Sequence, residues 1–247
     1  MNTTRGRARI GVLVPFTNTN LEPDMALLCP QGASIHMSRL GGYDEDEIPD
    51  ETQMHMLGAS DLDEPLRLLM GVRPDVVLYG CTSATLTHGP AFDRELAAGI
   101  KQASGADTVT AAGAIVYAAQ ALGVTRVGFA SPYVPAINDM AVDYLSLMGI
   151  EAVTRAEVDA TLDNQGQGAL SPDDVLALGA RADHPEAQAI VLSCTDMRSV
   201  EIIDMLEQET GKPVITSNQA MMFEALQCLG IEPPMRAFGR LMQAPKQ

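Results

Sequence analysis

Apolar and polar positions follow two kinds of periodicity along the chain, one typical of strands and one typical of helices. Short runs rich in β-branched residues predict strands over residues 9–15, 33–39, 76–79, 108–110, 126–132, 189–192 and 213–217. Apolar residues at helical spacing predict helices from about residue 22 and over residues 57–70, 90–102, 113–122 and 221–229. Strands and helices that alternate in this way predict an α/β fold with parallel sheets.

Two of these strands, the third and the sixth, end in the same pattern of residues. Gly-Cys-Thr follows the third strand, with the cysteine at Cys81, and Ser-Cys-Thr follows the sixth, with the cysteine at Cys194. Open α/β sheets bind their ligands at the carboxyl ends of the strands. Each cysteine is therefore predicted to lie at a ligand-binding edge, beside the N-terminus of the helix that follows.

This correspondence extends to most of the chain. Four predicted elements have a counterpart later in the sequence. They are the first strand, the third strand, the strand over 108–110 and the helix that ends at Gly123. The counterparts are, in the same order, residues 126–132, residues 189–192, residues 213–217 and the helix that ends at Gly230. Four correspondences in one order indicate a duplicated half-molecule. Two such halves facing each other would bring the two cysteines to opposite walls of one cleft.

Composition narrows the class of protein. The 247 residues are 46% hydrophobic and 19% charged, which is typical of a globular enzyme with one large domain or two smaller ones. Aromatic residues make up 4%, tryptophan is absent and the net charge is −16, which argues against nucleic acid as a partner. The acidic field also repels anions, so an anionic substrate requires a pocket rich in hydrogen-bond donors.

The sequence predicts neither a membrane segment nor a metal site. No run approaches the roughly eighteen apolar residues of a membrane span, and the N-terminal segment lacks the apolar core of a signal peptide, so we expect a cytoplasmic protein. The four cysteines form no close pair and the four histidines are scattered, which argues against a disulfide framework and a zinc site. We interpret Cys29 and Cys228 as structural residues.

Two thiols on opposite walls of a cleft suit chemistry at a carbon beside a carboxylate. A thiol at a helix N-terminus is expected to have a lowered pKa, because the backbone amides stabilise the thiolate. One thiolate acts as base or nucleophile and the other thiol delivers a proton to the opposite face, so the scheme needs no cofactor. The hydroxyls and amides of Thr82, Ser83 and Thr195 would hold a carboxylate or an enolate-like oxygen. A single strand-end cysteine is more often a packing residue, but packing gives no reason for two copies in one context.

Two other features carry predictions of their own. The glycine-led acidic segment over residues 41–51 is interpreted as a solvated loop, with a mobile lid over the cleft as the alternative. His88, close to the Cys81 turn, is interpreted as a neutral histidine on a helix surface rather than a general base.

Several short motifs lie in the same order as the predicted elements. They are residues 14–22 with Asn18, the Cys81 turn, Ser131-Pro132-Tyr133, Asp163-Asn164, Ser193-Cys194 and Gly211-Lys212-Pro213-Val214. Together these motifs resemble those of the maleate isomerase and arylmalonate decarboxylase branch of the Asp/Glu/hydantoin racemase superfamily. The resemblance covers nearly the whole chain.

The resemblance implies an architecture. It consists of two pseudo-symmetric Rossmann-like (flavodoxin-like) halves, each with a four-stranded parallel sheet, and an active site in the cleft between them. A final helix returns to the first half, so the halves would be residues 1–117 plus 219–247 and residues 118–218. The family also implies no metal, no cofactor, a small carboxylate substrate, and a homodimer or higher homo-oligomer.

The resemblance also implies roles for eight residues. Cys81 and Cys194 would be catalytic, and the substrate would be bound by Asn18, Thr82, Ser83, Tyr133, Asn164 and Thr195. Arylmalonate decarboxylases have glycine in place of the first thiol, so two thiols favour cis–trans isomerisation of maleate. Cys81 would attack the double bond to give a succinyl thioether whose central bond rotates. Cys194 would protonate the neighbouring carbon and recover the proton as fumarate leaves.

Other activities stay open at this point. A racemase or epimerase of a small carboxylate or amino-acid derivative would use the same two-thiol proton transfer. A decarboxylase or a non-catalytic small-acid binding protein ranks lower. The sequences after the two cysteines differ from those of amino-acid racemases, which disfavours a glutamate-type pocket. Asp196 would oppose an anionic substrate, so we expect it at a helix N-terminus pointing to solvent, and Arg198 would offset it or bind a carboxylate.

Overall fold

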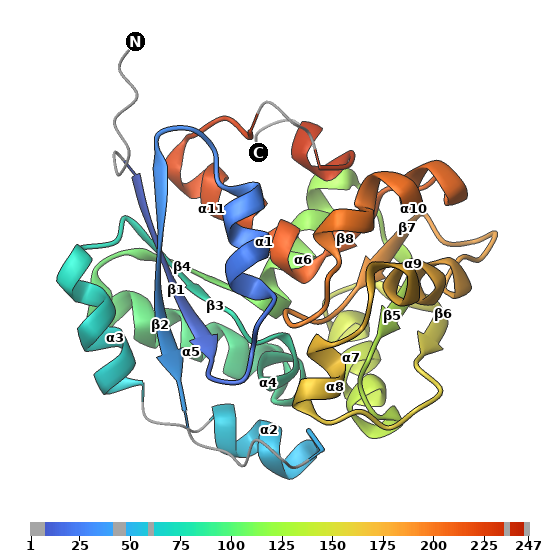
Figure 1. Ribbon diagram of the computed structural model, residues 1–247, viewed down its shortest axis with the longest axis horizontal. Coiled ribbons are helices and arrows are strands. Elements are labelled where there is room, and N and C mark those ends of the chain that lie inside the picture. The colour runs from blue at the N-terminus through green and yellow to red at the C-terminus, as the bar shows by residue number, and fades with distance from the viewer. Residues whose placement is uncertain (1–7, 42–47, 59–61, 235–237, 245–247) are drawn as a thin grey trace.

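Two four-stranded parallel sheets form the framework of the computed structural model, which describes residues 8–41, 48–58, 62–234 and 238–244 (Figure 1). The first sheet has the order β2-β1-β3-β4, with β1 at Ala8–Pro15, β2 at Ala33–Leu40, β3 at Val76–Tyr79 and β4 at Asp107–Thr110. The second sheet has the order β6-β5-β7-β8, with β5 at Arg126–Ser131, β6 at Glu151–Glu157, β7 at Ala189–Leu192 and β8 at Val214–Thr216. The two orders correspond strand by strand, so the predicted α/β class and the pseudo-symmetric halves are confirmed.

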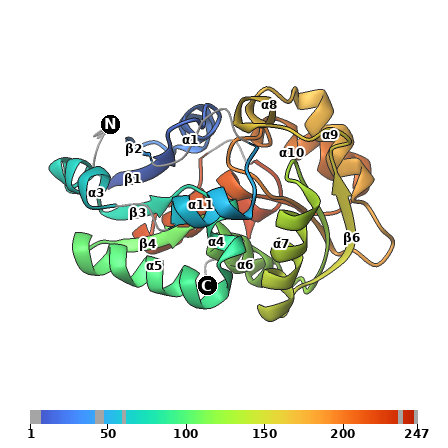
Figure 2. The ribbon, with the colours of Figure 1, turned by 90° about the horizontal axis from the view of Figure 1, so that it is seen from below.

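Helices connect the parallel strands and cover the sheets. They are α1 Leu21–Leu28, α2 Glu51–Gly58, α3 Asp63–Leu69, α4 Thr82–Thr87, α5 Gly89–Ser104, α6 Ala111–Leu122, α7 Pro135–Leu147, α8 Asn164–Gly168, α9 Pro172–Arg181, α10 Ile203–Thr210 and α11 Ser217–Leu229, with short 3-10 turns at Met70–Val72, Val200–Ile202 and Leu241–Gln243. Figure 2 shows α5, α6 and α7 along one face of the molecule, with α1 and α8 on the opposite face. Among the described helices, none combines the length and the hydrophobicity that a membrane span needs.

The inner strand β3 of the first sheet is buried on both faces. Val76 and Leu78 point into a large core that runs through both halves of the chain. Val77 and Tyr79, on the other face, point into a second core beneath α3 and α5. Side chains alternate between the faces of a strand, so a strand with two buried faces has an uninterrupted apolar sequence. This explains the continuous run that precedes Cys81.

The last strand and helix of each half are built alike. Thr110 and Thr216 cap the N-termini of α6 and α11, where each hydroxyl accepts a hydrogen bond from the backbone N–H three residues on. Gly123 and Gly230 end the same helices in the left-handed conformation, with φ of 66° and 64°, as predicted. Helix α11 packs against α6 and contacts β3, β4 and β8, so it lies between the two sheets.

The single helix predicted over residues 57–70 is wrong. Helix α2 ends at Gly58 and α3 begins at Asp63. Pro65 lies in the first turn of α3, where its missing N–H has no helical partner to lose, whereas it would break a helix that started at residue 57. A Cβ added at Gly58 would lie 2.6 Å from a ring carbon of His88, so this helix end packs closely against the residue after α4.

One strand lies outside the predicted set. Strand β6 is the edge strand of the second sheet, and only one of its seven residues is buried. Its polar and apolar residues are therefore mixed, and it lacks the apolar run that identified the inner strands.

Candidate active site

The residues that follow β3 and β7 line a single cleft between the two halves. Seven of the eight residues predicted for the site line this cleft, and Thr82 does not. The lining consists of Pro15, Thr17, Asn18, Pro49, Met54, Cys81, Ser83, Tyr133, Asn164, Gln167, Cys194, Thr195 and Asp196. The two cysteines therefore face one space, as the duplicated halves predicted.

Cys81 is the N-cap residue of the short helix α4 and is 5% exposed. The strand turns into this helix at Gly80, where an added Cβ would lie 2.4 Å from a methyl carbon of Leu21. The thiol lies 3.7 Å from the Ser83 hydroxyl. Burial raises the pKa of Cys81, and the hydrogen bonds from Ala84 N–H, the Ser83 hydroxyl and Ser83 N–H lower it less. The predicted net lowering of this pKa is therefore wrong, because desolvation outweighs the helix amides.

Cys194 is 4% exposed, and no α-helix begins beside it. A turn and the 3-10 turn Val200–Ile202 separate it from α10, so its predicted place at a helix N-terminus is wrong. The sulfur accepts a hydrogen bond from Asp196 N–H at 3.3 Å and lies 3.9 Å from Gln167 Oε1. Burial and then the charge of Asp196 raise the pKa of Cys194 to about 12. This thiol holds its proton more firmly than an ordinary cysteine.

Tyr133 brings a buried hydroxyl to both thiols. Its turn is fixed by hydrogen bonds from its own N–H to Ser131 Oγ at 3.1 Å and from Asn138 Nδ2 to its carbonyl oxygen at 3.0 Å. Burial, followed by the nearby Cys194 and Cys81, raises the pKa of Tyr133 well above its usual value. The hydroxyl therefore stays protonated and serves as a donor in the cleft.

Thr82 lies behind this wall of the cleft. Its hydroxyl donates to Ser217 Oγ at 2.9 Å, at the start of α11, and also hydrogen-bonds with the Tyr133 hydroxyl. The structure thus places Thr82 where it supports Tyr133 and joins α4 to the last helix.

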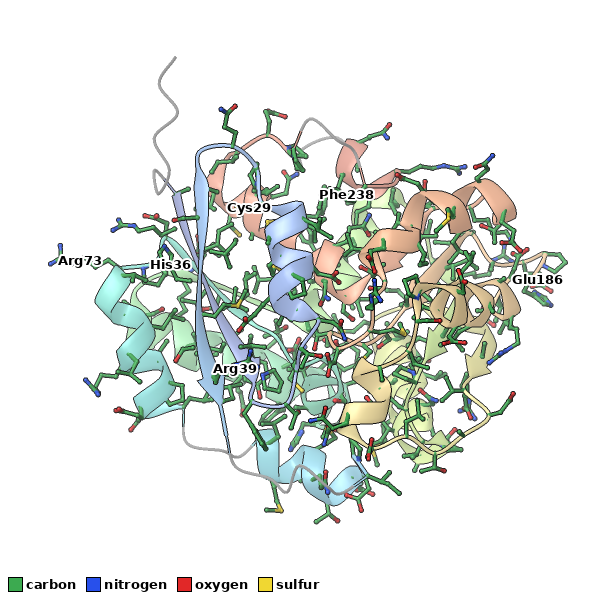
Figure 3. The ribbon with its side chains drawn as sticks, viewed as in Figure 1. Cys29, His36, Arg39, Arg73, Glu186 and Phe238 are labelled. Atoms are coloured by element: carbon green, nitrogen blue, oxygen red, sulfur yellow. The ribbon has the colours of Figure 1, made fainter. Side chains whose placement is uncertain are left out.

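Asn18 and Thr195 join the two halves at the cleft. Asn18 Nδ2 donates to Thr195 Oγ1 at 3.0 Å, and that hydroxyl donates to the carbonyl oxygen of Gly80 at 3.0 Å. Asn18 Oδ1 accepts the N–H groups of Asn20 at 3.1 Å and Leu21 at 2.9 Å, at the start of α1. The loop is held from outside by Arg39, labelled in Figure 3, whose Nη1 donates to the Asn18 carbonyl oxygen at 2.7 Å.

Asn164 and Gln167 approach the cleft from one turn of α8. Asp163 caps this turn by accepting the N–H of Gly166 at 2.6 Å. The spacing of three residues places both side chains on the same side of the helix. The Nδ2 atom of Asn164 is buried and has no hydrogen-bond partner among the described residues. This amide is therefore a donor available to a ligand in the cleft.

The family model for arylmalonate decarboxylase matches residues 10–242 of this chain. The chain belongs to the arylmalonate decarboxylase family. Among similar proteins, the maleate isomerase of Pseudomonas putida is 26% identical over 242 residues, which cover 95% of this chain and 96% of that protein. The arylmalonate decarboxylase of Bordetella bronchiseptica is 26% identical over 243 residues, which cover 93% of this chain and 91% of that protein.

Solved structures of the same family superpose over nearly the full length. A mutant maleate cis–trans isomerase of Nocardia farcinica with a covalently bound succinylcysteine intermediate has a TM-score of 0.86 at 25% identity, covering 96% of this chain and 98% of that one. The maleate isomerase of Pseudomonas putida S16 with maleate has a TM-score of 0.84 at 25% identity, with the same coverage. The predicted membership of this branch of the superfamily is therefore confirmed.

In this member of the arylmalonate decarboxylase family, Asp196 is buried rather than exposed. Its Oδ1 accepts hydrogen bonds from Thr19 N–H at 2.9 Å, Asn20 N–H at 3.0 Å and Asn20 Nδ2 at 2.9 Å. Its predicted orientation towards solvent is wrong, because the loop before α1, in the other half, supplies hydrogen-bond donors to its carboxylate. Arg198 is directed elsewhere and pairs with Glu201 at 2.8 Å. The described lining contains no basic side chain, so N–H and O–H donors take that place.

Six lining residues lie outside the predicted set, and among them Gln167 and Met54 extend the site of this family member. Gln167 was missed because α8 was not predicted, although its spacing from Asn164 is a usable signal. Met54 lies on α2, whose residues were placed partly in a loop and partly in a longer helix. Residues 42–47 of the acidic segment lie outside the described residues, whereas Pro49, in the same segment, lines the cleft.

The other predicted candidates do not line the described cleft. His88 Nδ1 lies 2.7 Å from the Ala84 carbonyl oxygen and Nε2 lies 2.8 Å from His55 Nδ1, while burial lowers the pKa of His88. Cys29 follows the last residue of α1, as Figure 3 shows, and Cys228 is exposed on α11. Within the described residues, no three His, Cys, Asp or Glu side chains gather as they would around a metal ion.

Proposed function

We propose that this protein is a cofactor-independent isomerase that converts maleate to fumarate with Cys81 and Cys194. The observation that carries the proposal is that one buried thiol from each half faces a single cleft. The similarity to maleate isomerases over nearly the full length supports it, as does the succinylcysteine intermediate in one of them.

The two thiols differ in a way that suits two roles. Burial raises the pKa of both thiols and N–H or O–H donors lower it, but only at Cys194 does a neighbouring carboxylate, that of Asp196, raise the pKa further. Cys81 therefore loses its proton more readily and acts as the nucleophile. Cys194 stays protonated and acts as the acid.

The reaction follows from this asymmetry. The Cys81 thiolate adds to one carbon of the double bond, and Cys194 donates its proton to the other, which gives a succinyl thioether and a Cys194 thiolate. The central carbon–carbon bond is now single and rotates. The Cys194 thiolate then removes a proton from the same carbon, the carbon–sulfur bond breaks, and fumarate leaves with the Cys81 thiolate restored.

Neutral donors hold the two carboxylates in this proposal. Asn164 Nδ2 has no other partner among the described residues, and the Tyr133 hydroxyl remains protonated. The Ser83 hydroxyl lines the same space, and Asn18 and Thr195 lie beside it. Uncharged donors suit a substrate that must rotate, because hydrogen bonds re-form in the new position without leaving a buried charge unpaired.

The test follows maleate by proton NMR with the reduced protein. We expect fumarate to appear, and we expect Cys81→Ser and Cys194→Ser each to abolish turnover. Cys228→Ser, at an exposed cysteine outside the cleft, serves as the control and should retain full activity. Incubating Cys194→Ser with maleate should leave a succinyl group on Cys81, measured by peptide mass spectrometry. Turnover that survives both active-site substitutions would contradict the proposal.

The same geometry supports one alternative, a racemase or epimerase of a small carboxylate. Two thiols on opposite walls would remove a proton from one face of a carbon and return it to the other. Exchange of the α-proton of a chiral carboxylate for deuterium, without formation of fumarate from maleate, would favour this activity.

The organisation of the chain completes the proposal. We keep residues 1–117 plus 219–247 and residues 118–218 as the two halves, which the contacts of α11 with β3, β4 and α6 support.

We also expect a homodimer or higher homo-oligomer, which light scattering would measure.

A further inference from the structure

A second cavity, of about 270 Å³, lies between α5, α6, α7 and α11, and it shares no lining residue with the thiol cleft. Thr108 and Thr110 of β4 contribute to its wall, and Tyr117 and Tyr144 approach from α6 and α7. Figure 2 shows the three helices α5, α6 and α7 together along one face of the molecule. The mechanism proposed above uses none of these residues.

Two carboxyl groups from different helices line this cavity, Asp93 on α5 and Glu224 on α11. Asp93 is 6% exposed; its Oδ2 accepts the Tyr144 hydroxyl at 2.8 Å, whereas its Oδ1 is buried and has no partner among the described residues. Glu224 Oε2 is likewise buried and has no partner there. Each carboxyl group therefore presents one buried oxygen with unused capacity to accept a hydrogen bond.

The charge of these two groups is offset only in part, because burial raises the pKa of Asp93 more than the hydrogen bonds from Thr110 and Tyr144 and the charge of Arg94 lower it. Burial, together with the charge of Asp93, raises the pKa of Glu224 to about 7, and burial raises the pKa of Asp93. Arg94 also lines the cavity but is exposed, and within the described part of the chain no ion pair joins it to either carboxylate. A buried carboxylate without a cation is costly, and a positively charged ligand would remove that cost.

We propose that this cavity binds a small organic cation through a primary ammonium group. An ammonium has three N–H donors and no acceptor, which matches the two unpartnered carboxyl oxygens and a neighbouring threonine or glutamine oxygen. Val116, Met148 and the Tyr117 ring provide surface for a short apolar stem. Among the described residues, no cluster of three metal-binding side chains lies at this cavity.

Binding is coupled to the protonation of the cavity. The titratable and charged groups that face it are Asp93 and Arg94 on α5, Tyr117 on α6, Tyr144 on α7, and Glu224 with the nearby Cys228 on α11. An ammonium favours the carboxylate form of Glu224. Below pH 7 binding therefore releases a proton, and well above pH 7 it releases none.

The test titrates the full-length protein with n-butylammonium chloride by isothermal calorimetry, with 1-butanol as the neutral comparison. We expect saturable binding of one butylammonium per chain and no saturable binding of 1-butanol. Glu224→Gln should weaken butylammonium binding at least about tenfold, which is the loss expected for one charge-assisted hydrogen bond. Glu95→Gln, at an exposed position on α5, removes the same charge and should leave the affinity unchanged.

Three results would overturn the proposal. The first is that Glu224→Gln and Glu95→Gln weaken butylammonium binding equally, and the second is that 1-butanol binds as tightly as butylammonium. The third is an affinity for butylammonium that falls as the protein concentration rises, which would show that a second copy fills the cavity. Repeating the titration at pH 6 in two buffers of different ionisation enthalpy should reveal the released proton. Cys81→Ser should bind butylammonium like the parent, so this test is independent of the thiol chemistry.

Discussion

Asp196→Asn separates the charge beside Cys194 from the hydrogen bonds that the same side chain makes. The substitution keeps the volume of the side chain and one acceptor oxygen, and removes the negative charge. In the protein that oxygen accepts three N–H groups from Thr19 and Asn20, at 2.9, 3.0 and 2.9 Å. The variant therefore changes the electrostatics of the thiol while the loop before α1 stays attached.

The structure gives the size of both effects. A hydrogen bond to a charged group contributes about 1 kcal/mol more than one to a neutral group, so three bonds would lose about 3 kcal/mol. Relief from burying the carboxylate, whose pKa burial raises, offsets part of this. We expect the free energy of unfolding to fall by about 1–2 kcal/mol. The charge of Asp196 is the second cause of the raised pKa of Cys194, so that pKa should fall from about 12 but stay above normal.

The assay is alkylation of Cys194 by iodoacetamide, followed by peptide mass spectrometry in a Cys81→Ser background. At pH 8 the alkylation rate should rise about tenfold for each unit by which the pKa falls, because the thiolate fraction rises by that factor. Asp173→Asn, at an exposed position in the first turn of α9, is the matched control and should not change the rate. An unchanged or slower rate in a folded Asp196→Asn protein would refute the electrostatic coupling.

Three further predictions test other parts of the structure. Asn164→Ala should raise KM for maleate at least about tenfold with a smaller effect on kcat, measured by steady-state kinetics, because it removes an unpaired donor in the cleft. Gly128→Ala should lower the free energy of unfolding by at least about 3 kcal/mol, measured by urea denaturation, because its Cβ would lie 2.0 Å from the backbone oxygen of Ala182. Gly11→Ala, whose Cβ would meet a flexible leucine at 2.9 Å, should lower the free energy of unfolding by about 1 kcal/mol. The pKa of Glu224 is raised from 4.5 to about 7, so the stability it contributes, up to about 3 kcal/mol at 1.36 kcal/mol per pKa unit, is complete below pH 4.5 and lost as the pH rises through 7. Urea unfolding at pH 5 and pH 8 should show this loss, and Glu224→Gln should show a smaller one, because Asp24, whose pKa burial also raises to about 7, remains.

The sequence was sufficient to locate the two sheets and both thiols. Inner parallel strands have unbroken apolar runs because both faces are buried, so β3 and β7 were recognisable, and each cysteine then had a defined place at a strand end. The helix ends at Gly123 and Gly230 were equally predictable, because a left-handed residue at that position favours glycine. These features depend only on neighbouring residues.

The features of the site that the sequence did not predict depend on contacts between distant residues. The buried position of Asp196 requires donors from the loop before α1, which lies in the other half. The raised pKa of Cys81 requires knowing that the cleft buries the thiol completely enough to outweigh the helix amides. Thr82 shows a third case, since its side chain turns to Ser217 and leaves the cleft wall to Ser83.

The residues two positions after each thiol have a consequence for how such a site arises. Ser83 places a hydroxyl beside Cys81, whereas Asp196 brings a carboxylate whose charge raises the pKa of Cys194. Two identical subunits related by a twofold axis would present the same neighbour to both sulfurs and so the same acidity. Joining both halves in one chain frees each position to change alone. A chain that contains both halves can therefore set the direction of proton transfer across the cleft. A symmetric pair of identical halves cannot.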